Sequence, residues 1–154
     1  MKIYTSYFYK VRFFEPHFLG FSTCISDPKW FHDFRKPPYT FIDKRGVLNG
    51  LRADPFVPGN DCAGLCYGPQ GCGGVPSSCA FLQAYYDQLC KLNVEEITNR
   101  LEELGRSIKF NMNFQEEPKF ILLVHEAPTN PCSERSQLQR WLKEKNLGGE
   151  ELTF

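Results

Sequence analysis

The chain has 154 residues, and 18 Lys and Arg balance 18 Asp and Glu, so the formal net charge is zero. The length predicts one domain over residues 1–154, because a domain spans about 100–200 residues. The neutral balance argues against non-specific nucleic-acid binding while leaving a local basic patch open, and a hydrophobic content of 42% excludes a disordered chain.

Two strands are expected near the N-terminus. Residues 3–6 are rich in aromatic and β-branched side chains, which predicts a first strand leading into an aromatic loop. The apolar stretch Phe18–Ile25 follows a break at Pro16 and ends before Pro28, which predicts a second strand.

Residues 26–80 are expected to contain little regular structure, because they hold 7 of the 11 prolines and 8 of the 12 glycines. So long an irregular segment is rare in a compact domain, so either a bound group orders it or it serves a function. Its side chains include Trp30 and Arg52, a stacking surface and a cation that suit a base or a nucleotide. The alternative is that Trp30 only plugs the core beneath a long loop.

Two helices are expected after this segment. Apolar residues recur at helical spacing from Cys79 to Leu92 and predict the first. The second begins at Asn93, whose side chain can cap the helix with Glu96 three residues on, and Gly105 is predicted to end it.

The continuous apolar run Lys119–Val124 is typical of a strand buried on both faces, and predicts the central strand. A last helix is expected to follow, with Asn130 as its N-cap, Trp141 facing inward and Gly148 just beyond its end. Strands that alternate with helices predict an α/β fold with a mostly parallel sheet flanked by helices.

The loop after this strand carries the candidate chemistry, because ligands of open α/β sheets bind beyond the carboxyl ends of the strands. The predicted cap places Cys132 and Ser133 in the first helical turn, where the helix dipole and Arg135 favour a thiolate. Glu126 is a candidate general base or a contact for a ligand hydroxyl. His125, Ser133 and Arg135 are candidate ligand-binding residues. The alternatives are ordinary packing for Cys132, a surface charge for Arg135 and a core hydrogen bond for His125.

No stretch of the sequence predicts export or membrane insertion. Residues 1–6 contain no continuous apolar run, and no window approaches the roughly 20 apolar residues of a membrane span. We therefore expect a cytoplasmic protein with no membrane partner. In that compartment an odd count of seven cysteines argues for metal binding or reactive thiols over a disulfide framework.

Four cysteines lie within 18 residues: Cys62, Cys66, Cys72 and Cys79. Four thiolates form the ligand set of a closed zinc site or of an iron–sulfur cluster. Zinc is favoured because the usual cluster runs have tighter spacing, and a bound metal would supply the folding energy that this segment lacks. Isolated or redox thiols and disulfides are the alternatives. Cys24 and Cys90 are interpreted as core residues.

The two ends of the chain resemble the domain-of-unknown-function family numbered 488, especially its short phage and bacterial members. The matching parts are the opening Met1–Phe8, the strand and acid Leu122–Glu126, the element Cys132–Arg135 and the helix with Trp141. The resemblance implies a Rossmann-like α/β domain without an established activity, in which the cysteine-rich segment is an insertion. It also implies a bacterial or phage-infected host cell.

The leading hypothesis is a protein that binds or processes a nucleotide- or nucleoside-type ligand at the last strand, loop and helix. Arg135 and Arg52 would hold phosphate, Glu126 would contact ribose or assist the chemistry, and Cys132 would be a nucleophile or a contact. Whether it is an enzyme stays open, as does assembly into a homo-oligomer. One alternative is a non-catalytic phage counter-defence protein that sequesters a nucleotide signal. The other is a zinc-stabilised module that binds nucleic acid or protein.

Overall fold

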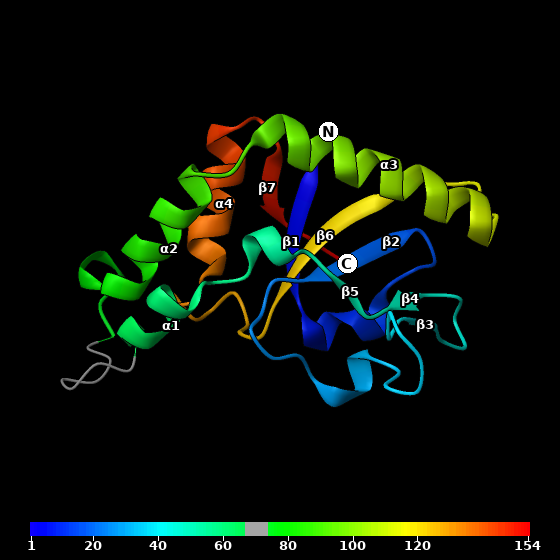
Figure 1. Cartoon of the computed structure of the whole chain (residues 1–154), viewed down its shortest axis with the longest axis horizontal. Helices are drawn as coiled ribbons and strands as arrows, with labels where there is room; N and C mark the ends of the chain where they lie inside the picture. Colours follow the sequence, from blue (N-terminus) through cyan, green and yellow to red (C-terminus); the bar gives the residue numbers. More distant parts are fainter. Residues whose placement is uncertain (67–73) are drawn as a thin grey trace.

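The computed structural model describes residues 1–66 and 74–154, and within these ranges five strands form one parallel sheet with helices against it (Figure 1). The strand order is β5-β2-β6-β1-β7. The strands are β1 (Ile3–Tyr7), β2 (Phe18–Ser22), β5 (Leu51–Arg52), β6 (Lys119–Val124) and β7 (Gly148–Glu151). A separate antiparallel pair consists of β3 (Phe41–Ile42) and β4 (Leu48–Asn49).

Strand β6 lies in the middle of the sheet, which confirms the predicted central strand. It pairs in parallel with β1 on one side and with β2 on the other. Its last four residues, Ile121 to Val124, are fully buried, since both faces of the sheet are covered. Burial on both faces explains why this strand shows a continuous apolar run where a half-exposed strand would alternate.

Three helices cover one face: α2 (Ala80–Cys90), α3 (Val94–Met112) and α4 (Arg135–Glu144). Leu122 and Val124 of β6 pack there with Trp141 of α4, which confirms the inward-facing tryptophan. A short helix, α1 (Asn60–Cys66), contacts α2. None of the helices in the described ranges has both the length and the hydropathy to cross a bilayer.

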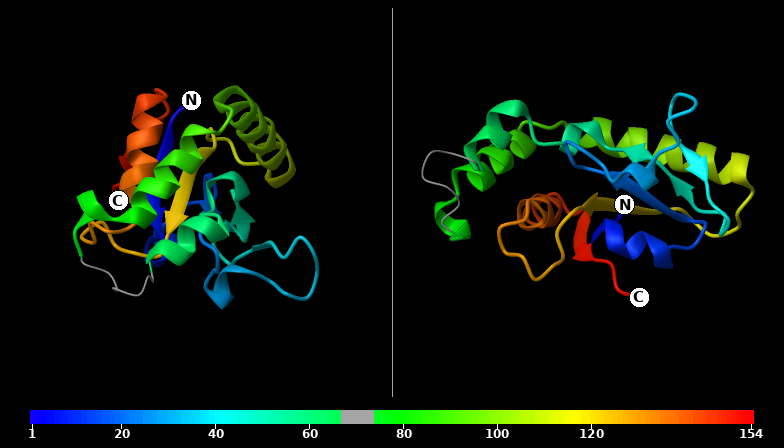
Figure 2. Two further views of the ribbon diagram at one scale, coloured as in Figure 1. Left: turned by 60° about the vertical axis from the view of Figure 1, so that its left-hand side comes forward. Right: turned by 90° about the horizontal axis from the view of Figure 1, so that it is seen from below.

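The opposite face is covered by short and irregular structure instead of long helices. The 3₁₀ helix η1 (Phe8–Phe13) lies there, on the other side of the sheet from α3 (Figure 2). Phe8 and Phe31 belong to this second core with Ile121 and Leu123 of β6. The irregular segment after β2 is therefore ordered in part by ordinary apolar burial.

Parts of residues 26–80 also have regular structure that the sequence analysis did not anticipate. Strand β5 comes from this segment and forms the edge of the main sheet beside β2. Strand β2 itself ends at Ser22, not at Ile25, because the Ser22 Oγ accepts the Cys24 amide at 3.1 Å and turns the chain.

Helix α3 begins as predicted but runs further. Asn93 is its N-cap and accepts the Glu96 amide at 3.0 Å. Gly105 does not end the helix, which continues to Met112 and stops where Asn113 takes the left-handed conformation with φ of 54°. A Cβ on residue 105 would lie 2.7 Å from the Phe120 ring, so this glycine provides room for close packing of the helix on β6.

The C-terminal elements differ from the prediction at both ends of α4. The helix begins at Arg135, several residues after the expected cap, and it ends at Glu144. Gly148 and the glycine after it do not merely follow the helix: with φ of 90° and 83° they begin strand β7, which pairs with β1. Two glycines at the start of a four-residue strand weaken the pattern by which strands are recognised.

Gly105→Ala should lower the free energy of unfolding although alanine is the better helix former. The new methyl group would press on the Phe120 ring, and overpacking costs about 1–3 kcal/mol against about 1 kcal/mol gained in helix propensity. We expect a net loss of about 1 kcal/mol in urea unfolding. In a Phe120→Leu background the same substitution should become stabilising, and a stabilising effect in the parent chain would contradict the packing argument.

Candidate functional site

Because all strands of the main sheet are parallel, their carboxyl ends meet at one edge. The residues at these ends are Tyr7, Ser22, Arg52, Val124 and Glu151. The candidate residues from the sequence follow directly: His125 and Glu126 continue β6, and Trp30 lies on the loop that leaves β2. This edge therefore brings together groups that are far apart along the chain.

The loop between β6 and α4 does not place Cys132 on a helix. Asn130 accepts the Cys132 amide with its side chain at 3.0 Å, which makes a local turn and not a helix cap. The helix begins three residues later, and the Ser133 Oγ accepts the Arg135 amide at 3.2 Å. The predicted placement of Cys132 and Ser133 in the first turn of the helix is therefore wrong, because both residues precede the helix.

Arg135 is not the exposed cation that the sequence predicts for a ligand phosphate. Its side chain is only 5% exposed, and its Nε atom lies 2.8 Å from the Glu151 carboxylate. Its Nη2 atom donates to the backbone oxygen of Glu126 at 2.6 Å, and its guanidinium lies 5.5 Å from the centre of the Tyr7 ring. Arg135 thus joins α4, β7 and the loop after β6.

Glu151 was not identified from the sequence, although it is central to this part of the edge. Its carboxylate accepts hydrogen bonds from the Arg135 guanidinium and, at 2.8 Å, from the Thr5 hydroxyl. Gln139 of α4 donates to the same hydroxyl at 2.8 Å. Glu151 could be found from the sequence only as a carboxylate at the end of a strand. Because β7 was not predicted, its last residue was not recognised as a candidate.

Glu126 is half-buried and accepts a hydrogen bond from the Ser133 hydroxyl at 3.1 Å. Burial raises the pKa of the neighbouring Glu134 carboxyl, and the negative charge of Glu126 raises it further. The positive charges of His125 and Arg135 act on Glu134 in the opposite direction. The loop thus presents two partly exposed acids, Glu126 and Glu134.

A second charged cluster surrounds Asp27, which the sequence analysis also missed. Its side chain is 3% exposed and accepts hydrogen bonds from Ser22, from His32 at 2.5 Å and from Arg52 at 2.7 Å. Burial alone would raise the pKa of Asp27, but these three hydrogen bonds outweigh it and hold the pKa below its ordinary value. Arg52 also donates to the backbone oxygen of Cys24 at 2.7 Å. Its guanidinium is therefore already bound within the protein, which argues against its predicted contact with a ligand phosphate.

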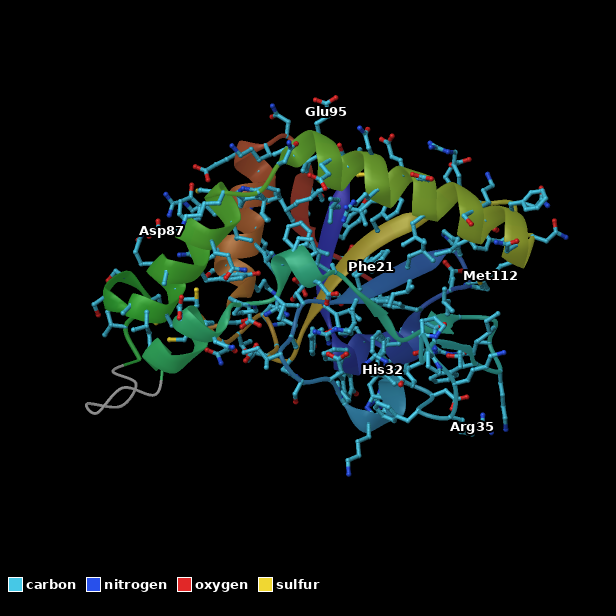
Figure 3. All side chains as sticks on the ribbon, viewed as in Figure 1. Phe21, His32, Arg35, Asp87, Glu95 and Met112 are labelled. Atoms are coloured by element: carbon cyan, nitrogen blue, oxygen red, sulfur yellow. The ribbon has the colours of Figure 1, made fainter. Side chains whose placement is uncertain are left out.

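His32 lies beneath the strand ends next to Phe31 (Figure 3). Because the Asp27 carboxylate can only accept, the His32 Nε2 atom carries the hydrogen of their bond. Its Nδ1 atom is buried, and among the described residues it has no hydrogen-bond partner. A Cβ on residue 50 would lie 3.3 Å from this atom, so Gly50, with φ of 96°, is required at that position.

An aromatic pocket of about 400 Å³ lies against η1 and the β3–β4 pair. Its lining residues are Phe8, Tyr9, Val11, Arg12, Trp30, Phe41, Asp43, Arg45 and Asn49. Trp30 is 52% exposed whereas Phe31 is buried, so Phe31 plugs the core and Trp30 faces solvent. Phe8 brings two predicted ligand residues together, because its ring centre lies 6.2 Å from that of Trp30 and 5.0 Å from that of His125.

His125 itself is exposed and donates from Nε2 to the Ser26 oxygen at 2.6 Å. This hydrogen bond ties the loop after β6 to the loop after β2. His125 is therefore a positioning group outside the pocket lining, and its ring packs against Phe8, which does line the pocket.

The cysteines are only partly described. Cys72 and the side chain of Cys66 lie outside the described parts of the chain, whereas Cys62 and Cys79 pack in one small apolar cluster on α2. In residues 1–66 and 74–154 no three His, Cys, Asp or Glu side chains form a group that could hold a metal ion. The four-cysteine metal centre stays a prediction.

The two cysteines interpreted as core residues differ. Cys24 is buried as expected, and burial followed by nearby carboxylates raises the pKa of its thiol to about 12, which excludes it as a nucleophile at neutral pH. Cys90 is exposed near the end of α2, so its interpretation as a core residue is wrong. Its helix turns that position away from the sheet.

Comparisons with known proteins give no match. No protein family model matches the chain, and no curated protein or solved structure matches it at a significant level.

Asp27→Asn should lower the free energy of unfolding by about 2 kcal/mol or more, because it removes the buried negative charge that accepts hydrogen bonds from Ser22, His32 and Arg52. The difference should depend on pH. Since the folded pKa of Asp27 lies below its ordinary value of 3.8, its contribution is complete above that value and is lost as the pH falls through the folded pKa. Urea unfolding of both proteins between pH 2 and 7 measures this dependence.

Asp33→Asn is the matched control. Asp33 also pairs with an arginine, but its partner Arg35 is 89% exposed. A solvent-exposed pair contributes little, so this variant should unfold almost as the parent does at neutral pH. Equal losses in the two variants would show that burial of Asp27 is not what makes its interactions strong.

Proposed function

We propose that the protein binds a nucleotide- or nucleoside-type ligand at the carboxyl edge of its parallel sheet, with the base in the aromatic pocket. The observation that carries this proposal is the combination of exposed aromatic side chains and guanidinium groups around one cavity of about 400 Å³. Small-molecule sites usually occupy about 300–1,000 Å³ and are mostly apolar with a few polar groups. One lining residue, Phe8, directly follows the carboxyl end of β1, which connects the pocket to the edge where α/β folds bind ligands.

The pocket chemistry suits a planar ring that carries a negative group. Trp30 and Tyr9 are each about half exposed, so their rings are accessible for stacking. The guanidinium carbon of Arg12 lies 3.8 Å from the centre of the Tyr9 ring, and Arg12 is exposed. This cation can meet a phosphate without breaking a buried ion pair. We therefore assign the phosphate contact to Arg12 in place of Arg52 and Arg135.

The loop after β6 supplies the polar side of the proposed site. Glu126 is a half-exposed acid next to His125, whose ring lies against Phe8 of the pocket lining. A carboxylate accepts the hydroxyl hydrogens of a ribose. Cys132 is half-buried on the same loop and is proposed as a further ligand contact.

Binding is the function that these contacts support best, in preference to turnover. Ser133 already donates to Glu126, and Arg135 is held by Glu151 and by the loop backbone. Polar groups that are hydrogen-bonded to one another in this way stabilise the shape of a site. Sequestration of a nucleotide signal without chemical change is the alternative given above. Sequestration requires no catalytic residue in addition to these groups.

The resemblance of both chain ends to the family numbered 488 is kept as part of the proposal. The parallel sheet with helices against it supports a Rossmann-like domain, and residues 26–80 would be the insertion. Strand β5 comes from this segment and pairs with β2, so such an insertion would extend the sheet edge that leads to the pocket.

Trp30→Ala and Arg12→Gln should each weaken binding of a nucleoside monophosphate by at least about fivefold. Loss of one stacking ring removes about 1–3 kcal/mol, and loss of the cation removes the phosphate contact. Isothermal titration against a panel of nucleosides and their monophosphates measures both. Arg12→Gln should affect the monophosphates and leave the nucleosides unchanged.

Phe34→Ala is the control for the pocket variants, because Phe34 is 65% exposed on the neighbouring loop and does not line the pocket. It should bind as the parent does. Unchanged binding in Trp30→Ala, or no binding to any member of the panel by the parent, would overturn the proposed function. Recovery of intact ligand after denaturation supports sequestration, whereas altered ligand that requires Glu126 and Cys132 supports catalysis.

We also propose that the cysteine-rich segment holds one zinc ion. Native mass spectrometry of protein purified from cells should then show one added zinc mass, lost in Cys62→Ser and in Cys79→Ser. Cys90→Ser is the control, because Cys90 is exposed on α2 and stands outside the proposed ligand set. A parent protein without any added metal mass would contradict the proposal.

A further inference from the structure

We propose that the ligand is a single-stranded nucleic acid, whose bases stack along an exposed aromatic strip that continues from the pocket. This inference rests on the proposed function, since it extends the same site from one nucleotide to several. The aromatic strip consists of Tyr9, Phe13 and Phe154, with the guanidinium of Arg12 stacked on the Tyr9 ring.

The rings of the strip lie in series across the surface. The ring centres of Tyr9 and Phe13 are 6.3 Å apart, and those of Phe13 and Phe154 are 5.9 Å apart. Tyr9 is 52% exposed, Phe13 is 50% exposed and Phe154 is 57% exposed. Large apolar rings left half in water and next to one another mark an interaction surface.

Cations accompany the strip over its length. The Lys10 Nζ atom lies 5.4 Å from the centre of the Phe13 ring and 5.7 Å from that of Phe154. Arg12 stacks on Tyr9, so its guanidinium plane is itself a stacking surface. Rings and cations in alternation match a strand of bases joined by phosphates.

The charge of the chain is unevenly divided, although its sum is zero. Residues 1–45 contain eight Lys and Arg and four Asp and Glu, a net charge of +4, so the remainder carries −4. These residues include Tyr9 and Phe13 of the strip, the cations Lys10 and Arg12, and most of the pocket lining. The two cations beside the rings attract a polyanion even when the whole protein is neutral.

The strip continues directly into the pocket, because Tyr9 and Arg12 belong to both. The pocket accepts one base from the strand, and the strip stacks the bases that follow. A duplex cannot use these surfaces, since its bases are already stacked and paired. The geometry therefore favours single strands over duplexes, and it favours a polyanion over a neutral apolar partner.

The test is fluorescence anisotropy with a labelled oligothymidylate of about twelve nucleotides, a length within the range that single-strand binders cover. We expect the oligonucleotide to bind at least about tenfold more tightly than thymidine monophosphate, because additional bases each contribute stacking. The logarithm of the affinity should fall with the logarithm of the salt concentration, with a slope of about −0.7 for each contacted phosphate.

Variants of the strip separate this inference from the proposed function. Phe13→Ala and Lys10→Gln change residues that do not line the pocket, so binding of the mononucleotide should stay as in the parent. Phe13→Ala should weaken oligonucleotide binding at least about fivefold, and Lys10→Gln should reduce the salt slope by about 0.7. Phe110→Ala is the matched control, because this ring is 85% exposed on α3 and should have no effect.

Each remaining outcome is decisive. If the mononucleotide binds and the oligonucleotide binds no more tightly, the inference is overturned and the proposed function stands. If neither binds, both fail. A duplex of equal length that binds as tightly as the single strand would overturn the choice of single strands. Sedimentation with vesicles of phosphatidylserine and phosphatidylcholine, without oligonucleotide binding, would assign the strip to a membrane surface.

Discussion

Burial of β6 on both faces is the constraint on which the rest of the structure depends. A strand without a solvent-facing side needs parallel neighbours and cover above and below. Strands β1 and β2 supply the neighbours, the long helices supply one cover and the aromatic 3₁₀ segment supplies the other. Parallel pairing then aligns every carboxyl end on one edge, so charged and aromatic residues from distant parts of the sequence meet there.

The arginines near the proposed site fall into two groups that differ in burial. Arg135 is buried and Arg52 is partly buried, and both are held by the carboxylates of Glu151 and Asp27, so they shape the edge. Arg12 is exposed over an aromatic ring and is accessible to a ligand. Chemical type alone does not separate these roles, because all three side chains are arginines. Depth in the structure separates them, since a buried pair broken by a ligand costs more than an exposed cation gains.

The sequence was informative where the physics is local. The apolar run of β6 and the Asn93 cap depend on neighbours within a few residues, and both were predicted. Strand β5 has two residues and β7 begins with two glycines, so neither carries a pattern. Gly105 resembles a helix end in the sequence, whereas in the fold it lets α3 pack closely on Phe120 of β6. The local sequence does not show this contact. The Asp27 cluster and the aromatic pocket depend on such contacts as well, which is why most of their members were missed.

Phe8 has one further consequence. Its ring touches Trp30 in the pocket and His125 at the start of the loop that carries Glu126. The pocket and the loop after β6 therefore share the Phe8 ring as a common contact. A ligand that displaces the Phe8 ring in the pocket would also disturb its contact with His125, and binding in the pocket would then be coupled to the position of the loop after β6.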